Sequence, residues 1–465
     1  MSSFSIMVHE KTTTALTFED FKIEVLNDYK IAVTSRECSL LGRKEVLTGK
    51  AKFGIFGDGK EVPQLAMAKY FKNGDFRSGY YRDQTFMMAI GQLSIKEFFA
   101  GLYGHTDLDY EPMSAGRQMG GHFVTHSLHA DGSWKNLTEQ KNSSSDISPT
   151  AAQMPRLLGL AYASKIYRQV PGITNAENFS NEGNEIAWGT IGNASTSEGV
   201  FFETINAAGV LQVPMVMSVW DDEYGISVHA KHQTTKESIS EILKGYQREN
   251  GTNGFEILQV KGWDYADLIA TYEKAAEVAR KEHVPVLVHV SQLTQPQGHS
   301  SSGSHERYKS TERLAWEKDY DCIRQMRLWM IAINIASPEE LDEIDANAKI
   351  AVLEGKKEAW KEFIDPIIHE QKELLLLLEK VAEMSQNKTK ILQLTAVLKN
   401  TKDPLKKEIL GTARKVLRLV NKESGQAELS QWIQNYTAVT QQKFSSHLHS
   451  ESNSNVYSVQ PVAPK

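Results

Sequence analysis

Cysteine is scarce in this chain of 465 residues, which contains only Cys38 and Cys322. So few cysteines exclude a disulfide-stabilised fold and favour a reducing compartment. Cys322 lies in a run with helical apolar spacing. At such a position a small core residue is more common than a reactive nucleophile, so we expect Cys322 in the core.

Long apolar runs and an excess of positive charge are also missing. The longest leucine run, at residues 374–378, spans five residues between two glutamates, whereas a membrane helix needs about 20 apolar residues. The first ten residues lack the basic and apolar segments of a secretory signal. The net charge of −6 argues against binding to nucleic acid. We therefore expect a cytoplasmic protein with no membrane or nucleic-acid partner.

The apolar pattern predicts an α/β fold, a parallel sheet flanked by helices, followed by an all-helical C-terminal region. A helix is expected at residues 18–50. Further along, helical stretches alternate with short β-branched runs, which is typical of a parallel sheet with right-handed crossovers. The expected helices lie at residues 153–169, 197–211 and 264–283, and the expected strands at 185–191, 214–219 and 284–290.

Beyond residue 338 the strand pattern stops. Residues 339–435 predict four or five antiparallel helices, with breaks near Pro366, residues 385–387, Pro404 and Gly425. We divide the chain into a flexible arm at 1–15, an α/β domain at 16–337, a helical region at 338–440 and a disordered linker at 441–465. The linker could precede a further domain in a longer natural chain, or it could be an ordinary frayed tail.

One segment predicts a phosphate-binding turn. Residues 192–199 have the sequence Gly-Asn-Ala-Ser-Thr-Ser-Glu-Gly and lie between an expected strand and an expected helix. Small residues let the backbone approach a ligand, and a helix N-terminus presents free N–H groups to a phosphate. Ligands of parallel sheets bind beyond the carboxyl ends of the strands, so we expect an anion at this turn.

The next expected strand ends in two adjacent acids, Asp221 and Asp222. Their carboxylates would lie at the same edge of the sheet as Asn193. An amide, a carboxylate and a diphosphate together form a hard-oxygen site that suits Mg²⁺. An acid pair after a strand is by itself more often a solvated loop, but the complete strand–helix–strand unit favours a binding site.

This unit resembles the thiamine diphosphate motif in the alpha subunits of 2-oxo acid dehydrogenases. That motif is Gly-Asp/Glu-Gly-Ala-x-x-Glu-Gly, followed one helix and one strand later by Asn-Asn-x-Tyr-x-Ile-Ser. The chain matches it at Gly192, Glu198, Gly199, Tyr224, Ile226 and Ser227 and departs from it at Asn193, Ala194, Asp221 and Asp222. In the family, the first acid and the second Asn of the pair bind the metal. Amide and carboxylate have thus exchanged places here, and the resemblance implies Mg²⁺ on Asn193, Asp222 and the backbone carbonyl of Tyr224.

Other segments resemble the same family in the same order along the chain. They include Tyr-Arg at 81–82, Gly-Arg-Gln-Met-Gly-Gly-His at 116–122, a Ser/Thr segment at 146–153 and Gly-His-Ser-Ser at 298–301. The resemblance implies catalytic roles for His299 and His122, although His122 could equally be a loop histidine and Asn206 a buried, satisfied polar residue. The implied cofactor-binding residues are Tyr81, Arg82, Ser148, Thr150, Gly192, Ala194, Ser195, Glu198, Asn206 and His299.

The resemblance implies oxidative decarboxylation of a 2-oxo acid, with thiamine diphosphate and Mg²⁺ as cofactors. The acyl group would pass to a lipoyl-bearing acyltransferase component. A beta subunit or beta domain would complete the site, as in a heterotetramer, because no beta-type domain occurs in this chain. The Gly-Arg-Gln-Met segment favours branched-chain substrates, with pyruvate as the runner-up. The competing hypothesis is a non-catalytic assembly subunit whose cofactor site has decayed, and cofactor binding separates the two.

Overall fold

The computed structural model describes residues 17–445, 452–453, 455 and 458–463. The arm predicted at residues 1–15 and parts of the linker predicted at 441–465 lie outside these residues. Among the described residues, no helix combines the length and the apolar character needed to cross a membrane.

A six-stranded sheet, parallel throughout and ordered β2-β1-β3-β4-β8-β7, forms the centre of the fold. This confirms the α/β prediction. Its strands are β1 Phe76–Ser78, β2 Asn142–Ser143, β3 Ala187–Gly192, β4 Met215–Trp220, β7 Glu256–Lys261 and β8 Val286–Ser291. In the register of β3 and β4, Gly192 is opposite Trp220. The residues that follow these two strands therefore leave the sheet at one common edge.

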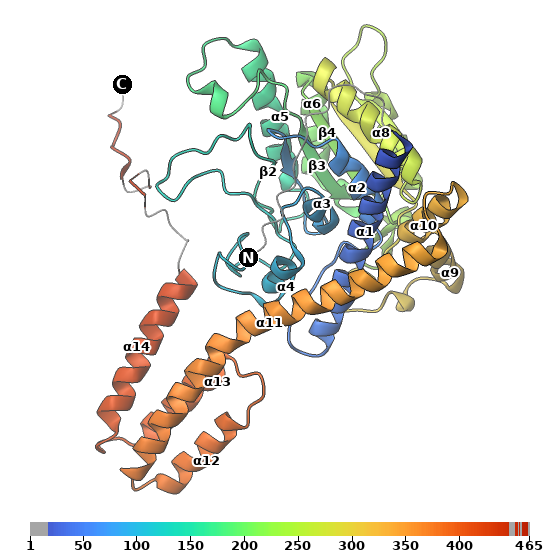
Figure 1. The fold of residues 1–465 in the computed structure, drawn as a ribbon. Coiled ribbons are helices and arrows are strands. Elements are labelled where there is room, and N and C mark those ends of the chain that lie inside the picture. The colour runs from blue at the N-terminus through green and yellow to red at the C-terminus, as the bar shows by residue number, and fades with distance from the viewer. Residues whose placement is uncertain (1–16, 446–451, 454, 456–457, 464–465) are drawn as a thin grey trace.

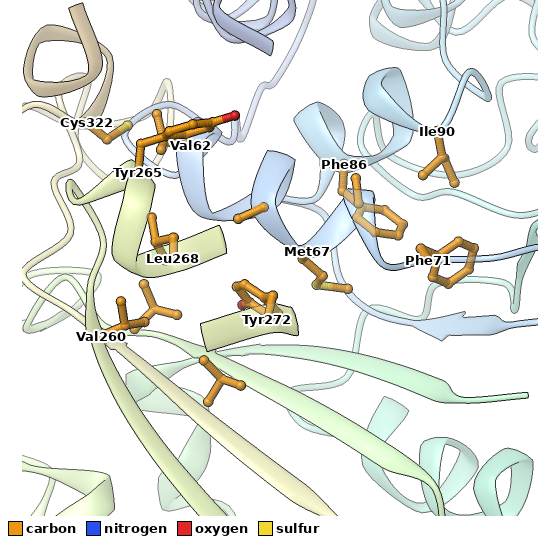
Figure 2. Packing of buried hydrophobic residues seen from close by; sticks show 14 of the residues in the cluster. Val62, Met67, Phe71, Phe86, Ile90, Val260, Tyr265, Leu268, Tyr272 and Cys322 are labelled. Atoms are coloured by element: carbon orange, nitrogen blue, oxygen red, sulfur yellow. The ribbon is translucent and has the colours of Figure 1, made fainter. Parts of the chain in front are cut away.

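Helices cover both faces of the sheet (Figure 1). Helices α5 (Gln153–Gln169) and α6 (Gly199–Leu211) pack on one face. Helices α1 (Phe18–Leu47), α2 (Glu61–Lys69) and α8 (Tyr265–Glu277) pack on the other. Figure 2 shows part of this second layer, including Val62, Met67, Leu268 and Tyr272. The apolar residues of each helix thus explain the two-sided burial of the central strands.

Shorter helices connect the layers: α3 (Gln84–Ala89), α4 (Ile95–Tyr103), α9 (Thr311–Asp319) and α10 (Cys322–Ala332). Cys322 is buried at the start of α10, as predicted. The sequence patterns missed β1, β2 and β7. The first two have three and two residues, too short for a periodic signal, and β7 alternates exposed and buried positions only weakly.

The C-terminal region consists of α11 (Pro338–Glu383), α12 (Lys388–Lys399), α13 (Lys406–Leu419) and α14 (Gln426–Ser445). The first half of α11 packs along α1 and α4, and its second half forms a separate apolar core with α12, α13 and α14. Figure 1 shows this bundle extending away from the sheet. The predicted break near Pro366 is wrong, because α11 runs through this proline without interruption.

Candidate functional site

A cavity of about 540 Å³, the main cavity, opens at the carboxyl ends of β3 and β4. Segments that are far apart in the sequence meet around it. Of the predicted site residues, its walls contain Tyr81, Arg82, Ser148, Thr150, Gly192, Asn193, Ala194, Ser195, Asp222, Tyr224 and His299. Lys60, Gln295 and Lys309, which the sequence analysis did not single out, lie in the same walls.

A 3₁₀ turn at Asn193–Ser197 forms the floor of the predicted phosphate site. It is this turn, rather than the first turn of α6, that borders the main cavity. Glu198, which directly precedes α6, and Asn206 on α6 are exposed and do not line the cavity. Glycine at position 225 leaves room for this turn, because a Cβ there would lie 2.6 Å from Ala194 Cβ. The neighbouring Ile226 has φ of +58°, a strained value for a β-branched residue.

Arg82 also lines the main cavity, where hydrogen bonds fix its guanidinium. Its Nη1 donates to the carbonyl oxygen of Phe56 at 2.6 Å, and its Nη2 donates to the carbonyl oxygen and to Nδ1 of His299 at 3.0 and 3.1 Å. Burial and the charge of Arg82 lower the pKa of His299 to about 4. Since arginine can only donate, Nδ1 of His299 is the acceptor, and its neutral imidazole carries the proton on Nε2. His299 is therefore a neutral hydrogen-bond donor at pH 7.

A buried ion cluster supports the segments on either side of Arg82. Arg77 of β1 donates to Asp83 at 2.8 Å and to Asp146 at 2.9 Å, and none of the three side chains is exposed to solvent. Arg77 was not predicted from the sequence, because nothing in its local sequence distinguishes it from a surface arginine. The cluster ties the strand end before Tyr81 to the segment that contains Ser148.

His122 lies behind the wall of the main cavity. Its Nε2 is 3.1 Å from Ser148 Oγ, and its Nδ1 is 2.8 Å from the carbonyl oxygen of Met119. Ser148 lines the main cavity, whereas His122 does not. His122 is thus placed to orient Ser148.

The two adjacent acids after β4 have different surroundings. Asp221 Oδ2 is 2.9 Å from His289 Nε2, on the neighbouring strand β8. Asp222 faces the main cavity, where its Oδ1 accepts from the backbone N–H of Tyr224 and its Oδ2 is 2.8 Å from Lys60 Nζ. Burial raises the pKa of Asp222, but the charges of Lys60, Arg82 and Lys309 outweigh burial and lower the pKa below its ordinary value. Asp222 is therefore a carboxylate at neutral pH.

The lining of the main cavity fits a diphosphate. It contains three cationic side chains and one carboxylate, so its charge favours an anion. The predicted metal ligands supply one carboxylate, one amide and one backbone carbonyl. Among the residues that the structure describes, no group of three or more His, Cys, Asp or Glu side chains is arranged to bind a metal ion. This donor set fits Mg²⁺ only together with phosphate oxygens and water.

A second cavity, also of about 540 Å³, adjoins the main one, and Phe53 and Met119 line both. Its other walls come from α4 and from the C-terminal helices, with Phe363 of α11 and Phe444 of α14 among them. Two of its lining residues, Lys443 and Phe444, accept hydrogen bonds at their carbonyl oxygens from Arg117 Nη2, at 3.2 and 3.0 Å. The C-terminal helices thus reach the neighbourhood of the candidate site.

The part of the chain that forms the main cavity matches a known protein family, and the chain is similar to curated members of it. The model of the family described as dehydrogenase E1 component matches residues 29–367. The 2-oxoisovalerate dehydrogenase subunit alpha of Bacillus subtilis (strain 168) is 27% identical over 305 residues, 64% of this chain and 80% of that protein. Subunit alpha 1 of the mitochondrial 2-oxoisovalerate dehydrogenase of Arabidopsis thaliana is 24% identical over 315 residues, which are 67% of this chain and 58% of that protein. The pyruvate dehydrogenase E1 component subunit alpha of Porphyra purpurea is 27% identical over 321 residues, which are 68% of this chain and 82% of that protein.

Proposed function

The chain belongs to the dehydrogenase E1 component family, and from this membership we propose that it is the alpha part of a 2-oxo acid dehydrogenase. The observation that carries the proposal is the convergence of eleven predicted site residues on one cavity. Members of this family typically use thiamine diphosphate and Mg²⁺, and their alpha subunits function with a beta subunit. A decayed site would not be expected to preserve this convergence, so the non-catalytic alternative is less well supported.

Arg82 and the turn at Asn193–Ser197 would hold the diphosphate of the cofactor. The Nε–H of Arg82 is not used in the bonds to Phe56 and His299 and is available to a phosphate oxygen. Asn193, Asp222 and the carbonyl of Tyr224 are the proposed Mg²⁺ ligands. When bound, thiamine diphosphate supplies a nucleophilic carbon and an electron sink for decarboxylation.

We assign His299 the role of orienting the substrate. Its neutral ring offers Nε2–H to a carbonyl oxygen without adding a second positive charge beside Arg82. Branched-chain 2-oxo acids are the favoured substrates, with pyruvate next. The apolar side chains of Phe53, Ile55 and Met119 in the cavity wall suit a substrate with an aliphatic side chain.

Calorimetric titration with thiamine diphosphate and Mg²⁺ tests cofactor binding. Gly225→Ala should weaken binding at least about tenfold, because its Cβ would displace the turn at Ala194. Gly199→Ala is the matched control, since a Cβ at Gly199 meets no atom within 4 Å. A folded wild-type chain that binds no cofactor would refute the proposal and support the assembly subunit.

Decarboxylation tests the partner requirement. The purified chain alone should release no carbon dioxide from a panel of 2-oxo acids. Carbon dioxide should be released once a beta partner is added, because the beta part completes the site. Acyl transfer should then require a lipoyl-bearing acyltransferase component. Robust turnover by the chain alone would contradict the assignment to an alpha part. The cytoplasmic location stays a prediction that cell fractionation can test.

A further inference from the structure

Lys60 is a buried lysine in the wall of the main cavity, with only 1% of its surface exposed. It directly precedes α2, at the end of a tight Gly-Asp-Gly turn. Gly59 has φ of +85°, and a Cβ there would lie 2.2 Å from the carbonyl oxygen of Thr294. Only glycine allows the turn to approach so closely. The backbone therefore places Lys60 against the segment at residues 294–295.

Three acceptors surround the ammonium group of Lys60. They are Asp222 Oδ2 at 2.8 Å, Gln295 Oε1 at 2.7 Å and the carbonyl oxygen of Thr294 at 3.2 Å. An ammonium has three N–H donors, so each has one partner. The group is thus fixed beside the carboxylate that is the proposed metal ligand.

The charge balance around Asp222 follows from this geometry. A carboxylate repels an incoming phosphate, and a divalent cation bound between them can offset this repulsion. Here Lys60 already neutralises Asp222. The remaining cations in the cavity wall are Arg82 and Lys309. Lys309 also forms an ion pair, at 2.7 Å, with Glu317, which does not line the cavity. A diphosphate that enters the cavity therefore meets no uncompensated negative charge.

We propose that Lys60 is an internal counterion of the cofactor site, so that binding of the diphosphate depends only weakly on a divalent metal. This rests on the proposed function, whose cofactor it concerns. The pair of Lys60 and Asp222 lies at one of the two positions where amide and carboxylate are exchanged. Any bound Mg²⁺ then contributes mainly to the orientation of the diphosphate rather than to its affinity.

Calorimetric titrations with thiamine diphosphate, and separately with inorganic pyrophosphate, test the proposal with Mg²⁺ and with EDTA. For the wild-type chain, the dissociation constants in the two conditions should agree within about tenfold. Lys60→Gln should bind about 100-fold more weakly in EDTA and regain most of its affinity in Mg²⁺, since the unpaired carboxylate then needs the metal. Lys60→Arg should resemble the wild type.

Controls separate this proposal from its premise. Lys244→Gln removes an exposed lysine that pairs with Glu241 and should not change either titration. Thermal unfolding shows whether Lys60→Gln is folded; if it is not, the wild-type comparison decides alone. Wild-type binding that requires Mg²⁺ would overturn the internal counterion and leave the proposed function intact. Absence of binding in both conditions would overturn the proposed function itself.

Discussion

At the scale of single residues, the main cavity controls protonation through burial and fixed charge. His299 shows this most clearly, because Arg82 is within hydrogen-bond distance of its ring and the ring is largely removed from solvent. An ionised His299 beside Arg82 would place two positive charges in contact. The folded chain therefore keeps the ring neutral over the physiological range.

The free energy of unfolding should fall as the pH is lowered from about 6.5 to about 4. His299 binds a proton below pH 6.5 in the unfolded chain but only below about pH 4 in the folded chain. The unfolded state holds more protons in this window, so acid favours unfolding. His299→Gln should give a shallower dependence in urea denaturation between pH 4 and 6.5. His369→Gln, at an exposed site on α11, is the control, and equal slopes for the wild type and His299→Gln would contradict the prediction.

Individual site residues were predictable only where a motif marks them. The spacing of small residues and acids after two expected strands led to Gly192, Asn193 and Asp222, and the register of β3 and β4 explains why these positions converge. Lys60 carries no such mark. Its partner Asp222 lies 162 residues away in the sequence, so the pair exists only through the fold.

At the scale of elements, α11 shows why a local rule failed. Proline usually interrupts a helix, because it cannot donate to the carbonyl four residues earlier. That carbonyl belongs to Glu362, and the imidazole of His105 lies beside it, where the carbonyl raises the pKa of the ring against the lowering effect of burial. A ring N–H in this place can offset part of the lost helical bond, and α11 continues through the proline. The other three predicted breaks coincide with the gaps between α11 and α12, α12 and α13, and α13 and α14.

His105→Ala should destabilise the chain by about 1 kcal/mol, because it removes the ring beside the half-buried Glu362, whose carbonyl has lost its helical donor to Pro366. In a Pro366→Ala background the loss should be smaller, since residue 366 then supplies the helical N–H. Urea denaturation of the two single variants and the double variant measures this coupling. Additive losses would show that His105 does not compensate for the proline.

At the scale of the whole molecule, the C-terminal helices and the sheet domain meet beside the candidate site. Arg117 belongs to the Gly-Arg-Gln-Met segment that predicts branched-chain substrates, and its guanidinium contacts the carbonyl end of α14. A cation at a helix C-terminus pairs with free carbonyls and with the negative end of the dipole. This contact links a loop of the sheet domain to the last helix of the bundle.

Arg117→Met should loosen the end of α14 without unfolding the rest of the chain. Backbone amides at residues 436–445 should exchange about tenfold faster with deuterium, because two charge-assisted bonds are lost. Arg414→Met, an exposed position on α13, should leave this exchange unchanged. Unaltered protection at residues 436–445 in Arg117→Met would show that apolar packing alone seats the helix.

The shared wall of the two cavities has a consequence for inhibitor chemistry. Leu405 and Phe444 line the second cavity and lie beyond residues 29–367, the part that the family has in common. A compound anchored there and extended past Met119 would reach the main cavity from a side that family members need not share. Selectivity among these enzymes would then come from the added helices rather than from the conserved chemistry of the cofactor.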